Sequence, residues 1–262
     1  MKIINKFILN FFRFFGYNIK RIQKEEKKFL DFDQIYKKIL RKKKIVIFDV
    51  GGNRGQSIKR FIKNFPFAEI HCFEPVKDEY LYLKDKFGHN KKIKLNNFAL
   101  GKKNEIKNFY INAKSSTSSF NKLNKNSEWI KQRSKESNKN IESFTIKSQR
   151  TIIKSIDHYC KINKIKHIDI LKLDTQGYED QILSGSKNTL KSEKISVIEL
   201  EMIFDNVYEK YLTFTDIEKN LLKNNYRFAG IETCNNNLFE GIIFFGDLIY
   251  INKKLLKLNL KH

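Results

Sequence analysis

The sequence predicts an α/β fold in which a doubly wound, largely parallel sheet has helices on both faces and is closed by an antiparallel strand pair. Two observations carry this prediction. Apolar runs of strand length alternate with segments of helical periodicity along most of the chain. The runs are continuously apolar, as expected of parallel strands that are covered on both faces. A length of 262 residues suffices for one such domain with appendages.

The first half of the predicted domain alternates regularly between strands and helices. The β-branched run at 45–50 is typical of a central strand, and apolar residues recur at helical spacing after the glycines that follow it. Pro75 ends the second strand because proline has no N–H to donate to a ladder. The predicted elements are a helix at 32–40, a strand at 45–50, a helix at 56–65, a strand at 68–74, a helix at 76–87 and a strand at 93–100.

The middle of the chain is less regular, and alternation resumes after it. We expect a polar insertion or a mobile loop at 121–140, which contains the single tryptophan, Trp129. Ser155 is placed to cap a short helix. The predicted elements are strands at 105–112 and 144–154, a helix at 155–163, a strand at 168–174, a helix at 178–190, a strand at 195–201, a helix at 214–224 and a closing strand pair at 226–232 and 241–251.

The chain carries a large positive charge, with 52 Lys and Arg against 29 Asp and Glu. Such a surplus can mark a protein that binds nucleic acid. Lys, Asn, Ile and Phe are all abundant here while Pro occurs twice, which is the residue usage of an AT-rich genome. We therefore assign most of the charge to solvated surface and do not expect nucleic acid as a partner.

The ends of the chain predict a basic amphipathic helical extension at 1–44 and a basic tail at 253–262, around a domain at 45–252. Apolar residues within 1–15 gather on one helical face and basic residues on the other. This segment would contact an anionic membrane peripherally or pack on protein, and both alternatives stay open. No apolar run approaches ~20 residues, and no signal-peptide cleavage site follows.

The three cysteines, Cys72, Cys160 and Cys234, lie far apart in the chain. Their spacing suggests neither a zinc site nor a disulfide framework. This pattern fits a protein of the reducing cytoplasm. The alternative, which the N-terminal extension suggests, is a peripheral position on the inner face of the membrane. The sequence does not indicate an oligomeric state.

The strongest local pattern is the turn after the first strand, Asp49-Val-Gly-Gly-Asn-Arg-Gly55. Glycines let the backbone approach a ligand closely where side chains would collide. Glu74 ends the next strand about twenty residues on, where a carboxylate binds ribose hydroxyls in Rossmann-like units. Because Asp49 would repel a pyrophosphate and attract a cationic methionine moiety, S-adenosylmethionine is the predicted cofactor. Its predicted binding residues are Asp49, Gly51, Gly52, Asn53, Gly55 and Glu74.

Several segments occur in the order that is found in the FkbM family of S-adenosylmethionine-dependent methyltransferases, and from 45 to 251 the chain resembles this family. They are the glycine turn, Cys72-Phe-Glu-Pro75, Phe98-Ala-Leu-Gly101, the serines at 115–119, Ile170-Leu-Lys-Leu-Asp-Thr-Gln-Gly-Tyr-Glu179 and Glu199-Leu-Glu201. The resemblance implies a class I methyltransferase sheet and O-methylation of a sugar or polyketide hydroxyl. It also adds Pro75 and Ala99 to the expected cofactor site. Many members have an acid at the position of Gln176.

Asp174 is the first catalytic candidate because it ends the strand beside the place where the methyl group is expected. It would act as a general base or accept a substrate hydroxyl. Paired with Glu199 or Glu201, which share one face of their strand, it would instead hold a divalent cation. A third alternative is a helix-capping role. Glu199 and His158 complete the set of catalytic candidates.

These patterns predict an S-adenosylmethionine-dependent O-methyltransferase that acts on a hydroxyl of a sugar, polysaccharide or glycolipid precursor, with a small-molecule or glycan acceptor as its partner. An RNA methyltransferase is one alternative, motivated by the charge. For a base amine it should have an Asn/Asp-Pro-Pro-aromatic sequence, and this chain has Asp174-Thr-Gln-Gly-Tyr178. A non-catalytic module that binds an adenosyl ligand or a glycan is the other alternative.

Overall fold

The computed structural model describes residues 11, 13–16, 30–138, 140–234, 241 and 243–259. The chain divides into two compact units, Met1–Asp31 and Phe32–His262. Within the first unit, the described Phe14 and Phe15 are exposed. Most of the predicted amphipathic helix at 1–15 lies outside the described residues, so its membrane contact stays a prediction. In the part of the chain that is described, no helix is long and apolar enough to cross a membrane.

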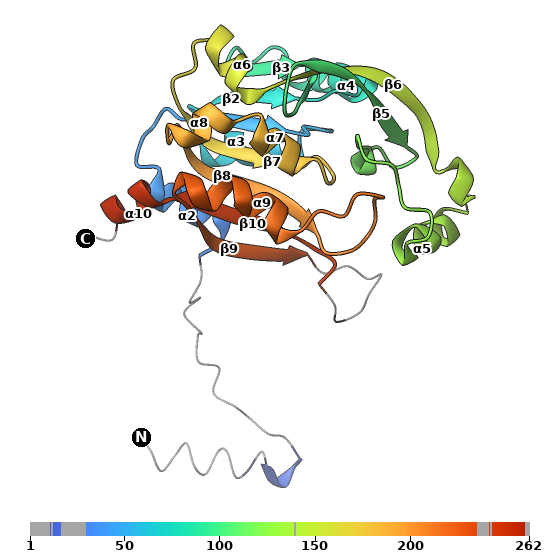
Figure 1. Ribbon diagram of the computed structural model, residues 1–262. Helices are drawn as coiled ribbons and strands as arrows, with labels where there is room; N and C mark the ends of the chain where they lie inside the picture. The colour runs from blue at the N-terminus through green and yellow to red at the C-terminus, as the bar shows by residue number, and fades with distance from the viewer. Residues whose placement is uncertain are drawn as a thin grey trace. The chain divides into compact units, whose positions relative to one another are not determined.

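A seven-stranded sheet in the order β3-β2-β1-β7-β8-β10-β9 forms the centre of the second unit (Figure 1). The first five of these strands run parallel, and β10 is antiparallel to both β8 and β9. The chain winds outward in both directions from β1 and β7, which confirms the doubly wound fold and the closing strand pair. Their bounds are β1 (Val46–Val50), β2 (Glu69–Phe73), β3 (Ile93–Asn96), β7 (Ile168–Leu173), β8 (Ile195–Ile203), β9 (Tyr226–Cys234) and β10 (Phe245–Asn252).

Helices cover both faces of this sheet because side chains alternate between its faces with a period of two. In β1, Ile47 packs toward one core and Phe48 toward the other, and both are fully buried. The first core receives α2 (Phe32–Ile39), α3 (Gln56–Asn64), α4 (Lys77–Phe87) and α10 (Lys253–Asn259), and the second receives α6 (Ile156–Ile162), α7 (Glu179–Ser184), α8 (Lys187–Lys191) and α9 (Phe214–Leu221).

Both appendages that the sequence predicts, at 1–44 and at 253–262, contribute residues to the first of these two cores. The α2 side chains of Phe32 and Tyr36 are buried in it, and Leu255 and Leu256 of α10 pack against it. The sequence interpretation includes α2 in the basic N-terminal extension at 1–44 and α10 in the basic tail at 253–262. Their few apolar residues face the sheet, which is a property that helical periodicity carries and overall composition does not.

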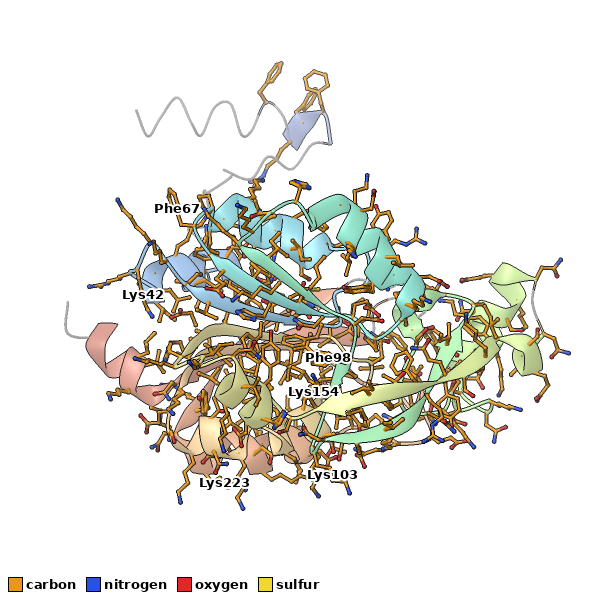
Figure 2. All side chains as sticks on the ribbon, turned by 90° about the horizontal axis from the view of Figure 1, so that it is seen from above. Lys42, Phe67, Phe98, Lys103, Lys154 and Lys223 are labelled. Atoms are coloured by element: carbon orange, nitrogen blue, oxygen red, sulfur yellow. The ribbon has the colours of Figure 1, made fainter. Side chains whose placement is uncertain are left out.

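A second, three-stranded sheet stands beside the first, in the order β4-β6-β5. It consists of β4 (Ala99–Leu100), β5 (Glu105–Asn112) and β6 (Thr145–Lys154). The single strand expected at 93–100 is therefore wrong. Asn97 turns the chain out of the large sheet, with its side-chain amide donating to the carbonyl oxygens of Glu74 and Pro75. Where β4 and β6 meet, the Lys154 ammonium lies 4.2 Å from the centroid of the Phe98 ring (Figure 2).

The helix expected at 178–190 is two helices, α7 and α8. Gly185 separates them, and its backbone lies so close to Gly101 that an added Cβ would meet the Gly101 carbonyl oxygen at 2.0 Å. Close packing of two backbones therefore ends α7, although the apolar periodicity of the sequence continues.

Residues 128–137 of the expected insertion form a helix, α5 (Glu128–Ser137). The Ser127 hydroxyl caps it by accepting the Ile130 N–H. Trp129 is 5 % exposed and packs with Phe144 in a small separate core. Two adjacent apolar residues, Trp129 and Ile130, thus anchor this otherwise polar part of the expected insertion or mobile loop in the small core.

The buried position of Trp129 predicts its fluorescence. Since the chain has a single tryptophan, the emission should be blue-shifted relative to free tryptophan in water and weakly quenched by acrylamide. Unfolding in urea should shift it to the red and make it easily quenched. A native spectrum that is already red-shifted and easily quenched would show that α5 does not pack as described.

Candidate active site

A cavity of about 600 Å³ lies at the carboxyl ends of β1, β2 and β7. This is the point at which the strand order reverses, where open α/β sheets bind their ligands. The volume is within the range of small-molecule sites. The lining residues are Val50, Gly51, Gly52, Asn53, Gln56, Ser57, Phe73, Glu74, Pro75, Val76, Ala99, Leu100, Phe109, Ser115, Ser116, Ser118, Phe120, Asp174, Thr175, Gln176, Tyr178 and Phe245.

The glycine turn between β1 and α3 forms one wall of this cavity. Gly51 has φ +89, and an added Cβ would meet the Asp174 carbonyl oxygen at 1.9 Å. Gly55 has φ +79, and its added Cβ would meet the Phe87 ring at 2.4 Å. A side chain at either position would push the turn away from its neighbours. The turn therefore brings bare backbone and the first turn of α3 to the cavity.

Glu74 connects the end of β2 to this turn. Its carboxylate accepts the backbone N–H groups of Asn53 and Val76, both at 2.8 Å. It is 5 % exposed, and burial raises its pKa to about 7 against the opposing effect of these two hydrogen bonds. Because each carboxylate oxygen can accept a second hydrogen bond, Glu74 can still bind hydroxyl groups of a ligand in the cavity.

Asp49 lies behind the turn and is fully buried. Among the residues that the structure describes, none donates a hydrogen bond to either of its carboxyl oxygens. Burial raises its pKa to about 6, with Lys172 opposing and Asp174 reinforcing this effect. A buried carboxyl group of this kind calls for a donor, and a cation beside the turn would supply one. Asp49 is not itself a lining residue of the cavity.

Asp174 lines the cavity between two neighbouring side chains. The ammonium group of Lys172 lies 3.1 Å from Asp174 Oδ2, and Gln176 Nε2 donates to Asp174 Oδ1 at 3.3 Å. The same Gln176 amide donates to the carboxylate of Glu201. Burial raises the pKa of Glu201 well above its usual value, and the negative charge of Asp174 adds to the effect. Asp174 and Glu201 are thus bridged by a neutral amide.

A second, smaller cavity of about 220 Å³ adjoins the first. Four residues line both cavities: Ser116, Asp174, Gln176 and Phe245. The two spaces therefore meet at the Asp174 carboxylate. Eight further residues line only the smaller cavity: Lys114, Thr117, Trp129, Arg133, Glu201, Ile203, Val207 and Phe244.

The structure contradicts the catalytic role expected for Glu199. This carboxylate is fully buried, accepts two hydrogen bonds from Arg60 Nη2 at 2.8 and 2.6 Å, and accepts another from the Tyr36 hydroxyl. It lines neither cavity. As the alternation of side chains along a strand predicts, Glu199 and Glu201 share one face of β8. Glu199, however, lies two residues further from the strand end, where α2 and α3 cover it.

His158 is also misplaced by the sequence interpretation. It lies on α6, and it is absent from the linings of both cavities. Its backbone N–H donates to the Ser155 hydroxyl, which caps the helix as expected. Within the described ranges, no group of three or more His, Cys, Asp or Glu side chains is arranged to hold a metal ion.

An aromatic wall opposite the glycine turn escaped the sequence analysis. The Phe120 ring lies 4.9 Å from Phe109 and 4.6 Å from Tyr178, measured between ring centroids. The serines at 115, 116 and 118 line the cavity next to these rings. Alternation in β5 could have identified Phe109 as an inward-facing residue. Phe245 has no comparable local signal, because strand pairing alone brings β10 to this edge.

The ion pair of Glu199 predicts a stability defect. In Glu199→Gln the Arg60 guanidinium loses its buried counterion and keeps, among the described residues, only Asp33, at 3.8 Å, so the free energy of unfolding should fall. The loss should be near the lower end of the ~3–5 kcal/mol typical of broken buried pairs, because the Arg60 side chain keeps 30 % of its surface exposed. Urea denaturation measures the change. Glu193→Gln, at a turn, is the control, and equal stability of the two variants would contradict the structural role.

Comparisons with known proteins agree with this geometry. The model of the methyltransferase FkbM domain matches residues 49–228. The curated 2-O-methyltransferase NoeI of Sinorhizobium fredii is 26 % identical over 187 residues, which cover 66 % of this chain and 70 % of that protein.

Two solved structures are similar at low identity. TrmK of M. capricolum, in complex with S-adenosylhomocysteine, is 12 % identical with a TM-score of 0.41, and the match covers 85 % of this chain and 69 % of that one. Magnesium protoporphyrin IX methyltransferase of Synechocystis PCC 6803 is 10 % identical with a TM-score of 0.41, over 94 % and 96 % of the two chains. On the family match, which spans more than half of its residues, the chain belongs to the FkbM family of S-adenosylmethionine-dependent methyltransferases.

Proposed function

We propose that this methyltransferase transfers a methyl group to a hydroxyl of a sugar, polysaccharide or glycolipid precursor. The observation that carries the proposal is the pair of cavities that meet at Asp174, since a donor and an acceptor must be aligned at one point for methyl transfer. The name of the relative NoeI, a 2-O-methyltransferase, supports oxygen as the accepting atom.

The larger cavity fits S-adenosylmethionine. Glu74 would accept hydrogen bonds from the ribose hydroxyls, and Asp49, with the glycine turn, would face the ammonium end of the methionine part. Val76, Ala99 and Leu100 supply an apolar surface for the adenine ring. Bound there, the cofactor supplies a methyl group on a positively charged sulfur. The excess of buried carboxyl groups around this cavity favours such a cationic ligand.

Asp174 is the group that we assign to the proton of the accepting hydroxyl. Its carboxylate lines both cavities, and the Lys172 ammonium lies 3.1 Å from its Oδ2. A carboxylate there can accept a hydrogen bond from the hydroxyl, orient its oxygen and take up its proton. Gln176 holds the Asp174 side chain through Oδ1.

This assignment predicts the effect of pH on cofactor binding. Asp49 and Glu74, whose pKa values are raised to about 6 and about 7, are protonated in the free protein at low pH, whereas a ligand ammonium and ribose hydroxyls favour their ionised forms. The affinity for S-adenosylhomocysteine should therefore rise with pH between about 5 and 7 and then level off. Each of the two carboxyl groups can raise it by at most about tenfold per pH unit.

Calorimetry in buffers of different ionisation enthalpy measures both the affinity and the protons released. Asp49→Asn should weaken binding at pH 8 and remove the part of the pH dependence centred near 6. Glu69→Gln, at the opposite end of β2 from Glu74, is the control. Proton uptake on binding, or an affinity independent of pH, would overturn the assignment of these two carboxyl groups.

Replacement of Asp174 tests the chemistry. With radiolabelled S-adenosylmethionine and a panel of oligosaccharides, the wild type should label saccharide, and Asp174→Asn should lower kcat by about 10²–10⁴-fold. Its affinity for S-adenosylhomocysteine should stay within a few-fold of the wild type. Asp85→Asn, at an exposed position of α4, is the control. Labelling of RNA and of no saccharide would contradict the proposed acceptor.

A further inference from the structure

We propose that the smaller cavity is the acceptor site and that it selects a saccharide that carries a negatively charged group, bound by Lys114 and Arg133. This inference rests on the proposed function and narrows its substrate class. Neither the family match nor the name of any relative specifies the charge of the acceptor.

The position of the smaller cavity makes it the route by which an acceptor reaches the donor. It shares Ser116, Asp174, Gln176 and Phe245 with the lining of the larger cavity, so the two cavities are neighbours. An acceptor hydroxyl that enters from this side arrives at the Asp174 carboxylate. The donor and the acceptor would then occupy separate spaces with a single point of contact, which is the arrangement that in-line transfer needs.

The shape of the smaller cavity suits one sugar ring. Its volume of about 220 Å³ lies below the ~300–1,000 Å³ of cavities that enclose drug-sized ligands. Trp129, Phe244 and Phe245 line it with aromatic surface, which packs well against the C–H faces of a sugar. Hydroxyl-bearing Ser116 and Thr117 stand beside them. Further units of a longer saccharide would extend into solvent.

The distribution of charge between the two cavities is uneven. Among the described residues that line the larger cavity there is no lysine, arginine or histidine, whereas Lys114 and Arg133 line the smaller one. The two acids of the smaller cavity, Asp174 and Glu201, are bridged by Gln176 at the junction. The acids therefore gather at the end where a proton must be taken up, and the two cations belong to the acceptor space.

Both cations can bind an anion. Lys114 forms no ion pair with any residue that the structure describes. Arg133 donates from Nη1 to Glu136 at 2.7 Å, and its guanidinium lies 6.0 Å from the centroid of the Trp129 ring. The guanidinium therefore lies beside the Trp129 ring at the smaller cavity, and an arginine presents its N–H donors in a planar fork that suits a carboxylate or phosphate. A carboxylate or phosphate on the sugar would form charge-assisted hydrogen bonds with both residues.

A binding experiment with matched saccharides tests the proposal. The protein is saturated with S-adenosylhomocysteine and titrated with digalacturonate, and separately with the carboxyl-reduced disaccharide, which has the same linkage but no charge. A second arm titrates sugar phosphates and the corresponding unphosphorylated sugars, and it shows whether the site prefers a carboxylate or a phosphate. At least one acidic sugar should bind at least tenfold more tightly than its neutral counterpart.

Variants that each remove one positive charge distinguish binding at Lys114 and Arg133 from general attraction to a protein of net charge +23. Lys114→Gln and Arg133→Gln should each lower affinity for the acidic sugar about tenfold and reduce its advantage over the neutral one. Lys223→Gln removes the same charge at an exposed position after α9, where the side chain points away from the fold (Figure 2), and should bind as the wild type does. Cooperative unfolding in urea, followed by circular dichroism, and an unchanged affinity for S-adenosylhomocysteine would show that each variant is folded.

Three results would overturn the proposal. One is that each acidic sugar and its neutral counterpart bind with equal affinity in both arms, or that neither binds. Another is an equal loss in Lys223→Gln, which would mean non-specific electrostatic binding. The third is salt-sensitive RNA binding that Lys114→Gln abolishes. A failure to bind S-adenosylhomocysteine would instead count against the proposed donor site, so the two ideas fail separately.

Discussion

The buried ammonium group of Lys172 is the charge on which the centre of this structure depends. Lys172 lies in register with Asp49 of β1 and with Glu199 of β8, so three charged side chains form a row across adjacent parallel strands. Burial alone would lower the pKa of Lys172, but Asp174 and Asp49 outweigh it and hold the pKa above its usual value. Ions removed from water cost several kcal/mol each unless paired. The carboxylates at the point where the strand order reverses therefore stay close together, because the Lys172 ammonium lies among them.

Carboxyl groups outnumber cations in this region, and the imbalance links the fold to its chemistry. Asp49 and Asp247 have pKa values raised to about 6, and Glu201 is raised further, chiefly by burial. Arg60 is committed to Glu199 and does not reach the cavity. These buried carboxyl groups thus make the region beside the glycine turn electronegative. A cationic ligand stabilises the ionised carboxyl groups there, whereas an anionic cofactor such as a dinucleotide would be repelled.

The donor half of the site was predictable from the sequence. The glycine turn and Glu74 belong to one strand-helix-strand unit, and each directly follows a strand. The carboxyl ends of neighbouring parallel strands share one edge of a sheet, so the spacing alone brings these residues together. The structure places Gly51, Gly52, Asn53, Glu74, Pro75, Ala99 and Asp174 along one cavity, whereas Asp49 and Gly55 lie outside its lining.

The sequence by itself determined the order of strands and helices and the chemistry of the turn, because hydrophobic period and turn residues are local properties. The tertiary structure alone decided that Glu201 reaches a cavity and Glu199 does not, since helices far away in the chain cover one and not the other. It also decided where Trp129 and Arg133 lie. These side chains come from a segment without strong periodicity, and they line the same cavity as Asp174 because Trp129 packs in a small core with Phe244 and Phe245. Such contacts between distant segments have no local pattern from which they could be predicted.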